Sequence, residues 1–148
     1  MDITIQPARP QQAADLSDIA YRAKGYWGYA ADQMEQWRVE FLTITPTYIE
    51  ANAVWVAVAD ARQIAGFAAV EQHGDEAILE HLWVLPEYIG QGIGKRLFLR
   101  VAATTPEFTF TSDPHAEDFY RKMGAQKIGE YQSGLQGRVL TTFRFTAK

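Results

Sequence analysis

The sequence predicts a mixed α/β (α+β) fold: a mostly antiparallel central sheet with one parallel crossover pair, flanked by about four helices. Three observations indicate it. Alternating apolar residues mark three consecutive strands between residues 53 and 85, a helical pattern follows a glycine-rich loop at residues 86–94, and another strand pattern follows that helix. A helix between two strands of one sheet is a crossover connection, which leaves those strands parallel.

The N-terminal third is predicted to hold a short strand and two helices. Residues 3–5 alternate apolar and polar side chains, as a strand does. In residues 10–24 the apolar positions recur at helical spacing, and Gly25 follows as a stop, so a helix is expected there. A second helix is expected over residues 30–41. One face of that second helix would present Met34, Trp37 and Phe41. The link between the helices is the aromatic stretch GYWGY.

The middle of the chain is predicted to form an antiparallel meander. AVWVAVAD and QIAGFAAVEQ form a hairpin pattern around Asp60-Ala61-Arg62, and Gly66 indicates a bulge or a close backbone approach. After the turn HGD, the strand EAILEHLWVLP ends at Pro86. Regular alternation would place two sets of side chains on opposite faces of this strand: Ile78, Glu80, Leu82 and Val84 on one, and Leu79, His81, Trp83 and Leu85 on the other.

The last third is predicted to be strand, helix and two strands. The strand EFTFTS follows Pro106, and DPHAEDFYRKMGA has Asp113 as a helix N-cap with Pro114 after it and Gly124 as a stop. Two final strands are expected at about residues 126–132 and 138–145. With no internal repeat and no linker in 148 residues, we expect a single domain spanning residues 1–148.

Composition excludes several classes of function. The chain is 47% apolar and carries a formal charge of −4, which gives no general attraction for nucleic acid or anionic membranes. The absence of cysteine excludes disulfides and thiolate metal sites, and the acidic N-terminus does not resemble a signal peptide, so we expect a cytoplasmic protein. Its apolar runs are too short to cross a bilayer. We expect no metal, because His73 and His115 should face solvent and form no metal-ligand spacing with His81.

The glycine loop is the strongest functional motif. In VLPEYIGQGIGKRLF, glycines at positions 90, 92 and 94 leave backbone N–H groups accessible before a helix that begins with Lys95 and Arg96. The stretch lacks the Ser or Thr and the spacing of a P-loop, and the preceding meander disfavours a dinucleotide-binding fold. A pyrophosphate is the favoured ligand, and the alternative is a tight turn that needs glycine only for its backbone freedom.

Together with the helix pattern downstream, this loop resembles the GNAT superfamily of acyl-CoA-dependent N-acetyltransferases. The family's Q/R-x-x-G-x-G/A signature follows a strand ending in a V-x-P-like pattern and precedes an F-Y-x-x-x-G-F/A helix. Here these elements are LWVLPEYIGQGIGKRL and AEDFYRKMGA. One departure is Ile89, which stands where the family usually has Gln or Arg, so a side-chain contact to phosphate is lost there.

The resemblance implies a GNAT-like fold and acetyl-CoA as cosubstrate. It implies that strand backbone at Leu82, Trp83 and Val84 pairs with the pantetheine arm, and that loop N–H groups bind the pyrophosphate. The cofactor-binding set also includes Asp113, which replaces a frequent Asn, and further members: Ile89, Gly90, Gln91, Gly92, Ile93, Gly94, Lys95, Phe119 and Tyr120. Tyr120 matches the tyrosine near the thioester sulfur that commonly acts as general acid. The first two helices and their link would form the acceptor side.

Acetyl transfer to an amine needs a base, an oxyanion contact and a proton for the thiolate. Glu80, a charged residue in an apolar strand, is our candidate general base, acting through water, with His81 as the second choice. The alternative is that Glu80 is a surface or ion-paired acid. Tyr120 is the candidate acid, and the alternative is a core tyrosine. A backbone N–H near Leu82 to Val84 would polarise the carbonyl.

The aromatic link is expected to line the acceptor pocket through Tyr26, Trp27 and Tyr29, since aromatic rings with polar tips both bury and orient a ligand. The alternative is that Trp27 and Trp37 only anchor the helix pair. The sequence does not identify the acceptor, although the acidic net charge slightly favours a cationic one.

The leading functional hypothesis is transfer of an acetyl group from acetyl-CoA to a primary amine of a small molecule or peptide, by direct attack in a ternary complex. An alternative is a non-catalytic acyl-CoA-binding sensor or regulatory module of the same fold. A third hypothesis is an oligomerisation module whose C-terminal segment GRVLTTFRFTAK pairs with another chain, and such an exposed strand edge would allow a homodimer without excluding catalysis.

Overall fold

The computed structural model describes residues 2–132 and 138–147. Within them, seven strands form one sheet in the order β1-β2-β3-β4-β5-β7-β6. Their bounds are β1 (Thr4–Pro7), β2 (Ala53–Val58), β3 (Ile64–His73), β4 (Glu76–Val84), β5 (Glu107–Ser112), β6 (Gln126–Gln132) and β7 (Val139–Thr146). All neighbouring strands are antiparallel except β4 and β5. The predicted mixed α/β sheet with one parallel pair is confirmed.

The same residues contain five α-helices: α1 (Ala13–Gly25), α2 (Ala31–Trp37), α3 (Pro46–Ala51), α4 (Ile93–Thr104) and α5 (Glu117–Lys122). The sequence analysis missed α3, a short helix that begins at Pro46 and is capped by Thr45, whose side chain accepts a hydrogen bond from the backbone N–H of Tyr48. The predicted second helix ends at Trp37 and continues as a π-helical turn to Leu42. This wider turn buries Leu42 and leaves Phe41 exposed, so Phe41 is not on the buried face as predicted.

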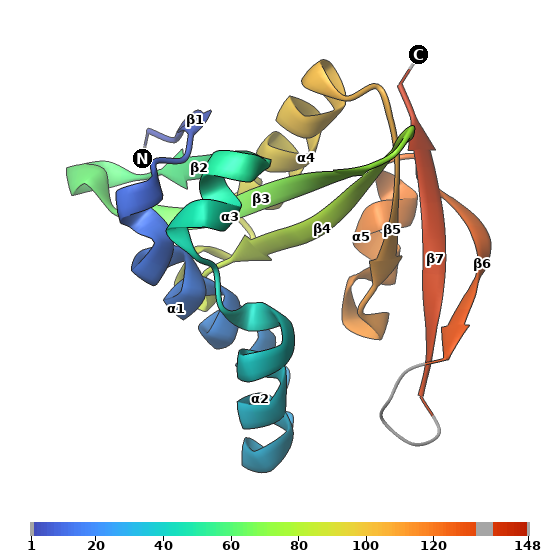
Figure 1. Cartoon of the computed structure of the whole chain (residues 1–148), viewed down its shortest axis with the longest axis horizontal. Coiled ribbons are helices and arrows are strands. Elements are labelled where there is room, and N and C mark those ends of the chain that lie inside the picture. Colours follow the sequence, from blue (N-terminus) through green and yellow to red (C-terminus); the bar gives the residue numbers. More distant parts are fainter. Residues whose placement is uncertain (1, 133–137, 148) are drawn as a thin grey trace.

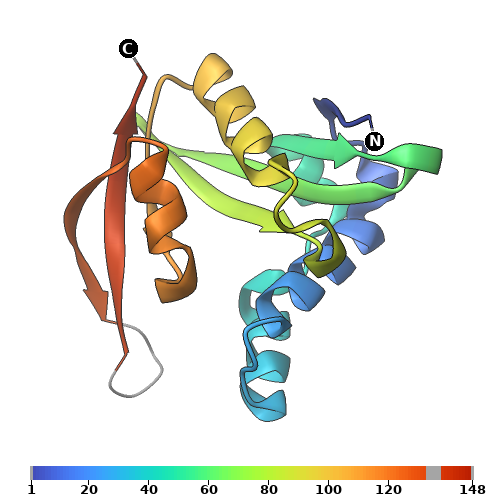
Figure 2. The same cartoon turned by 180° about the vertical axis from the view of Figure 1, so that it is seen from behind.

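The helices cover the two faces of the sheet and form two cores. α4 and α5 lie on one face (Figure 2), α1 and α3 lie on the other, over β2 to β4, and α2 packs on α1 and extends below the sheet (Figure 1). On α4, Leu97, Phe98 and Val101 are fully buried against the sheet. On the opposite face, Leu16 of α1 and Phe67 of β3 are equally buried. The strands β3 and β4 therefore run between two packed layers.

A β-bulge in β4 corrects the regular alternation predicted for this strand. Ala69 pairs with His81, but the next residue of β3, Val70, pairs with Leu79, so Glu80 is the extra residue. As a result Leu79 and Leu82 both pack into the core on the α4 side, whereas regular alternation would separate them. Hydrophobic periodicity cannot indicate this shift, because each half of the strand alternates normally by itself.

The parallel pair opens into a notch next to that bulge. In the part of the chain that the structure describes, β4 and β5 pair at one position, Ile78 with Thr109, and then diverge (Figure 1). The β5-facing backbone edge of β4 beyond Ile78 is thus left without a strand partner.

A close backbone approach holds β4 beside β3. A Cβ atom at Gly66 would lie 2.5 Å from the carbonyl oxygen of Trp83, and the β2–β3 register shifts beside Gly66, so both predictions for this glycine are confirmed. At the other end of the sheet, β7 lies between β5 and β6, so the terminal strand is not an edge. Of the segment GRVLTTFRFTAK, Gly137 and Lys148 lie outside the described residues.

Candidate active site

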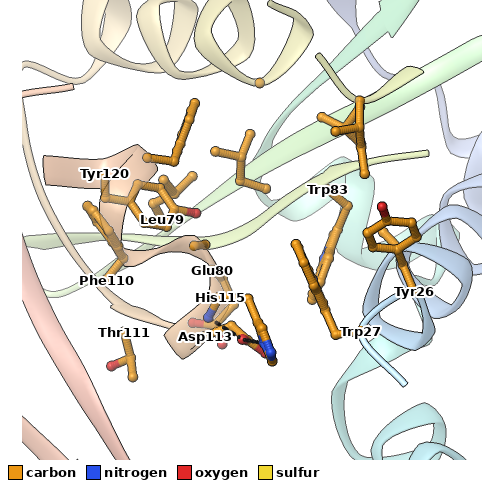
Figure 3. A pocket seen from close by; sticks show the side chains of 17 residues that line it. Tyr26, Trp27, Leu79, Glu80, Trp83, Phe110, Thr111, Asp113, His115 and Tyr120 are labelled. Carbon is orange, nitrogen blue, oxygen red and sulfur yellow. Dashed lines mark hydrogen bonds and ion pairs between the residues drawn. The ribbon is translucent and has the colours of Figure 1, made fainter. Parts of the chain in front are cut away.

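A cavity of about 340 Å³ fills the notch between β4 and β5 (Figure 3). Four parts of the chain line it: β4, the glycine loop with the start of α4, the end of β5 with α5, and the end of α1 with the aromatic link. The lining residues are Ala23, Tyr26, Trp27, Leu79, Glu80, Leu82, Trp83, Val84, Ile89, Gly94, Phe110, Thr111, Asp113, His115, Ala116, Phe119 and Tyr120. Most of this wall is apolar, so the few polar groups determine what the cavity can bind.

The glycine loop presents a row of backbone donors at one end of this cavity. Gly90 and Gly92 have φ angles of 89° and 77°, and Gly92 is the N-cap of α4 without a side-chain cap. In residues 2–132 and 138–147, no group accepts a hydrogen bond from the backbone N–H of any residue from Gly90 to Lys95. These donors lie at the positive end of the α4 dipole, which is the arrangement that binds phosphate groups.

Close packing fixes the loop against α5. A Cβ atom at Gly94 would lie 3.4 Å from Cζ of Phe119, so a larger residue would require the ring to move. Ile89, which stands where the resemblance would lead us to expect Gln or Arg, has an exposed side chain at the rim of the cavity. Its apolar side chain can add contact area there but no hydrogen bond to an anion.

Glu80 lies at the bulge, where β4 begins to separate from β5. The residue is exposed, and its carboxylate faces the cavity without an ion-pair partner in the described part of the chain. Partial burial, followed by repulsion from Glu71, raises the pKa of Glu80 above its ordinary value of 4.5. A carboxylate with a raised pKa is a better proton acceptor than an ordinary one, provided that it stays ionised.

Tyr120 projects from α5 to the opposite wall of the cavity (Figure 3). Its side chain is buried among Phe98, Phe110 and Phe119, and its hydroxyl has no hydrogen-bond partner among the residues described. Burial, followed by the negative charge of Asp113, raises the pKa of Tyr120 well above its ordinary value. The phenol therefore stays protonated and can donate into the cavity.

His81 does not line this cavity, because the bulge directs it to the opposite face of β4. Only 4% of its surface is exposed, and burial lowers its pKa to about 4, so the ring is neutral at neutral pH. Its Nδ1 accepts a hydrogen bond of 3.0 Å from Nε1 of Trp83. The remaining proton therefore lies on Nε2, and neither nitrogen is free to accept a proton.

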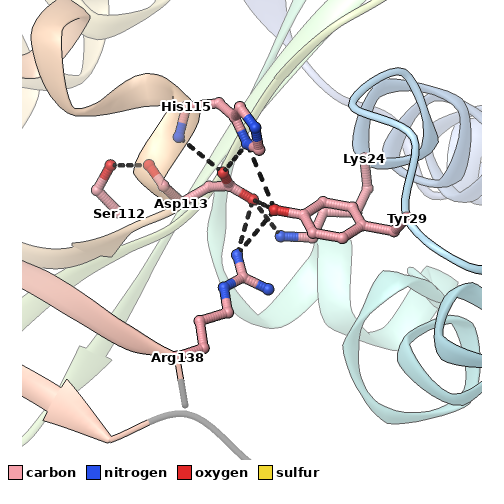
Figure 4. Close-up of polar contacts among 6 residues, drawn as sticks. All are labelled: Lys24, Tyr29, Ser112, Asp113, His115 and Arg138. Carbon is pink, nitrogen blue, oxygen red and sulfur yellow. Dashed lines mark hydrogen bonds and ion pairs between the residues drawn. The ribbon is translucent and has the colours of Figure 1, made fainter. Parts of the chain in front are cut away.

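Asp113 is the centre of a buried ion cluster beside the cavity (Figure 4). Its Oδ2 accepts hydrogen bonds from Nζ of Lys24 (2.6 Å), the hydroxyl of Tyr29 (2.8 Å) and Nη2 of Arg138 (3.1 Å). Its Oδ1 accepts the backbone N–H of His115 and lies 2.8 Å from Nδ1 of that ring. Both carboxylate oxygens are thus engaged within the protein, although the residue lines the cavity.

The electrostatics of this cluster depend on burial. Burial alone would raise the pKa of Asp113, but the hydrogen bonds from Lys24 and from the backbone of His115 hold it well below its usual value. Burial lowers the pKa of Lys24, and the contact with Asp113 offsets this only in part. The cluster connects α1, the aromatic link, β5 and the start of β7, so it fixes four segments that are distant in the sequence. Sequence analysis missed Lys24 and Arg138, because nothing local marks either of them.

The aromatic link divides between the cavity and the cluster. Tyr26 and Trp27 line the cavity, and Trp27 stacks on His115 with ring centroids 4.6 Å apart. Tyr29 does not line it, since its hydroxyl belongs to the Asp113 cluster and its ring packs on Trp37. Trp37 is buried and anchors α2, whereas Trp27 is 43% exposed. His115 is partly exposed as expected, but it is also held by Asp113 and Trp27, which the sequence analysis did not predict.

Comparison with known proteins identifies the family. A family model described as the acetyltransferase (GNAT) domain matches residues 50–124, which include β4, the glycine loop and α5. The chain belongs to the GNAT acetyltransferase family. It is 22% identical over 138 residues to the Escherichia coli K12 protein named Uncharacterized N-acetyltransferase YafP, covering 93% of this chain and 89% of that one. It is 29% identical over 96 residues to the peptidyl-lysine N-acetyltransferase YjaB of Salmonella typhimurium, covering 63% of each.

Solved GNAT structures have the same fold. The PaiA N-acetyltransferase of Thermoplasma acidophilum, in complex with coenzyme A, aligns with a TM-score of 0.83 at 19% identity and covers 99% of both chains. The solution structure of the apo form of Escherichia coli YjaB aligns with a TM-score of 0.75 at 21% identity over the full length of both chains. These likenesses show the fold, and the family shows acetyl transfer as the general activity.

Two further searches of the described residues bear on ligands of this GNAT protein. None of their helices is long and apolar enough to span a membrane. No group of three or more His, Asp or Glu side chains in those ranges is arranged to hold a metal ion.

Proposed function

We propose that this protein transfers an acetyl group from acetyl-CoA to a primary amine of a small molecule or peptide, by direct attack in a ternary complex. The observation that carries the proposal is one cavity lined by the carboxylate of Glu80 and the phenol of Tyr120, neither of which has an ion-pair or hydrogen-bond partner in residues 2–132 and 138–147. The glycine loop lies at the end of the same cavity. These are the base, the acid and the anion site that the reaction requires.

The residues fit coenzyme A. The N–H groups from Gly90 to Lys95, which have no acceptor in the described part of the chain, would bind the pyrophosphate, whereas the N–H of Ile89 donates to the carbonyl of Pro86. Gly92 and Gly94 leave room for close approach of the pyrophosphate. The unpaired edge of β4 at Leu82, Trp83 and Val84 would pair with the amide groups of the pantetheine arm, as another strand would. Phe119 supplies apolar contact next to the loop. The carboxylate of Asp113 is saturated by the protein, so we assign it to the cluster rather than to a hydrogen bond with the cofactor.

The proposed reaction moves three protons and one acyl group. Glu80 accepts a proton from the acceptor ammonium, directly or through water, and the neutral amine attacks the thioester carbonyl. A backbone N–H at the free edge of β4 stabilises the oxyanion. The carbon–sulfur bond then breaks, and Tyr120 donates its proton to the departing thiolate. The new amide nitrogen loses its extra proton, through water, to the Tyr120 phenolate, which restores the phenol. His81 is a poorer base than Glu80, because its ring is neutral, buried and already accepts a hydrogen bond from Trp83.

An amine panel with acetyl-CoA tests this proposal, with the release of free thiol as the readout. We expect turnover with at least one amine and a loss of about 100-fold in Glu80→Gln, the lower range for a general base. The matched control is Glu87→Gln, a carboxylate outside the cavity that pairs with Arg22 on the surface. Coenzyme A binding without thiol release for any amine would instead support the non-catalytic sensor. Unchanged turnover and pH profile in Glu80→Gln would exclude Glu80 as the base.

A further inference from the structure

A second cavity lies on the face of β4 that α1 and α3 cover. It has a volume of about 260 Å³ and meets the first cavity at Glu80, which lines both. We call it the glutamate pocket, because three of its lining residues are carboxylates. The lining residues are Glu40, Phe41, Thr43, Ile44, Tyr48, Glu71, Glu80 and His81.

The negative charge of the glutamate pocket is not balanced by lysine or arginine. Glu71 accepts hydrogen bonds from the Tyr48 hydroxyl (2.7 Å) and lies 2.9 Å from Nε2 of His73, and Glu40 accepts one from Gln36. Within residues 2–132 and 138–147, no Lys or Arg side chain forms an ion pair with any of the three lining carboxylates. Carboxylates in a recess with no counter-charge favour a cationic ligand.

A buried donor provides a second and independent sign of a ligand. His81 is 4% exposed and lines the glutamate pocket, and its Nε2–H has no acceptor among the described residues. In that part of the chain, the fully enclosed side-chain polar atom that lacks a hydrogen-bond partner is Nε1 of Trp55. Nε2 of His81 also lacks a partner but is not fully enclosed, so it must be accessible from open space. The glutamate pocket is the open space that the His81 ring borders. An ammonium or guanidinium group cannot accept this hydrogen bond, so the acceptor would be a hydration water of the bound cation or an oxygen atom elsewhere on the bound molecule.

We propose that the glutamate pocket binds a second cationic group of the acceptor, while Glu80 faces the amine that is acetylated. This inference rests on the proposed function and specifies its substrate class: a small amine or peptide side chain that carries a further ammonium or guanidinium group. Glu71 is the specificity-determining residue, because it is held by Tyr48 and His73 and lines the glutamate pocket but not the first cavity. Glu40 contributes from the exposed rim.

Three amines with four-carbon chains test the charge preference: 1,4-diaminobutane, n-butylamine and 4-aminobutanoate. We expect kcat/KM to fall in that order, by about tenfold at each step, because each step removes one favourable charge interaction or adds a repulsive one. Glu71→Gln should reduce the ratio of diamine to monoamine by about tenfold, measured at a pH where Glu80 is ionised. Glu50→Gln is the control, since it makes the same change of net charge on an exposed part of α3 outside the pocket.

Direct binding separates failure of this inference from failure of the proposed function. In the presence of coenzyme A, 1,4-diaminobutane should shift the backbone amide resonances of Tyr48 and His81, and Glu71→Gln should weaken that titration. Binding there without acetylation of any amine would support the cation site and overturn the transferase proposal. Equal kcat/KM for the three amines, or a ratio that Glu71→Gln leaves unchanged, would overturn the cation site. If Glu71→Gln unfolds, Glu40→Gln at the exposed rim takes its place and must lower the same ratio.

Discussion

The proposed cosubstrate side and the proposed acceptor side of β4 are built in different ways. On the cosubstrate side, the donors from Gly90 to Lys95 are consecutive in the sequence and belong to the backbone. On the acceptor side, the polar groups are side chains from α1, the aromatic link, β3, β5 and β7. A ligand shared by a whole family can be bound by one local backbone motif, whereas a specific acceptor needs side chains that only the fold brings together.

This difference gives the two sides different sensitivities to mutation. The loop depends on backbone conformation, so substitutions there should change cosubstrate affinity with small effects on stability. The acceptor side depends on the Asp113 cluster. The side chains of Asp113, Lys24 and Arg138 in this cluster are each less than 15% exposed. Loss of one buried charge there leaves the others unpaired, so its effect on stability should be large.

The largest effect is expected from Asp113→Ala. Removing the carboxylate leaves Lys24 and Arg138 buried without a counter-charge and removes the cap of the following turn, so the free energy of unfolding should fall by about 3–5 kcal/mol. Chemical denaturation measures this loss. The control is a double-mutant cycle: Lys24→Met should destabilise the Asp113→Ala protein less than it destabilises the wild type. A loss below about 1 kcal/mol would show that the cluster does not hold the acceptor side together.

The pH dependence of stability provides a second check on the same cluster. Since the pKa of Asp113 is lower in the folded chain than its ordinary value of 3.8, the stabilisation is fully present above that value. It should decline as the pH falls below 3.8, toward the folded-state pKa. Asp113→Ala should lack this part of the acid dependence. An identical acid slope in both proteins would contradict the ion pairing.

Tyr120→Phe should have the next largest effect, on turnover. The change removes the phenolic proton and keeps the aromatic packing against Phe98 and Phe110, so kcat should fall by about 100-fold. Steady-state kinetics give kcat, and calorimetric titration of coenzyme A should give an unchanged dissociation constant. A loss of affinity at constant kcat would show that Tyr120 only shapes the cavity.

Gly92→Ala should have a smaller effect, and on the cosubstrate side alone. Gly92 has a φ of 77°, and a left-handed conformation costs a residue with a Cβ about 1–2 kcal/mol. Relief of that strain would reorient the loop donors, so coenzyme A affinity should weaken by about fivefold. Gly74→Ala is the matched control, with a φ of 62°, nothing within 4 Å and a position in the β3–β4 turn. It should cost similar stability and leave the affinity unchanged.

The sequence predicted the parts of the molecule that local chemistry determines. Glycine spacing indicated the loop, and the helix-start pattern at Asp113 and Pro114 indicated the turn before α5. It could not predict the bulge at Glu80, because an extra residue in a strand leaves apolar alternation intact on either side. It also could not predict that Lys24 and Arg138 meet at Asp113, since they lie 89 and 25 residues away from it and such pairings depend on the folded chain. The acceptor side is therefore where sequence reasoning is weakest.

The smallest effect is expected in the pH profile of Glu71→Gln, and it tests whether the two cavities act as one site. Glu80 works as a base only when ionised, so kcat/KM should fall as the pH drops through its raised pKa. Removing the charge of Glu71 should lower the pKa of Glu80. The fall in kcat/KM on the acid side of the pH profile, the acid limb, would then occur at a lower pH. The limb should not return fully to the ordinary value, because partial burial is the larger cause of the shift and is unchanged. The other titratable groups around Glu80 stay in place in this variant: Glu40, Tyr48, His73 and His81 toward the glutamate pocket, and Tyr26, Asp113, His115 and Tyr120 around the first cavity.

The control for this shift is Glu50→Gln, which should leave the acid limb where it is. An unmoved limb in Glu71→Gln would show that the glutamate pocket does not act on the base. The acid limb of the kcat/KM profile could instead move in Glu71→Gln and disappear in Glu80→Gln. That result would show that neighbouring carboxylates on β3 and β4 serve acceptor recognition and proton removal, respectively. The β-bulge places Glu80 where it lines both cavities. This bulge, which apolar alternation in the sequence does not reveal, would then couple substrate choice to catalysis.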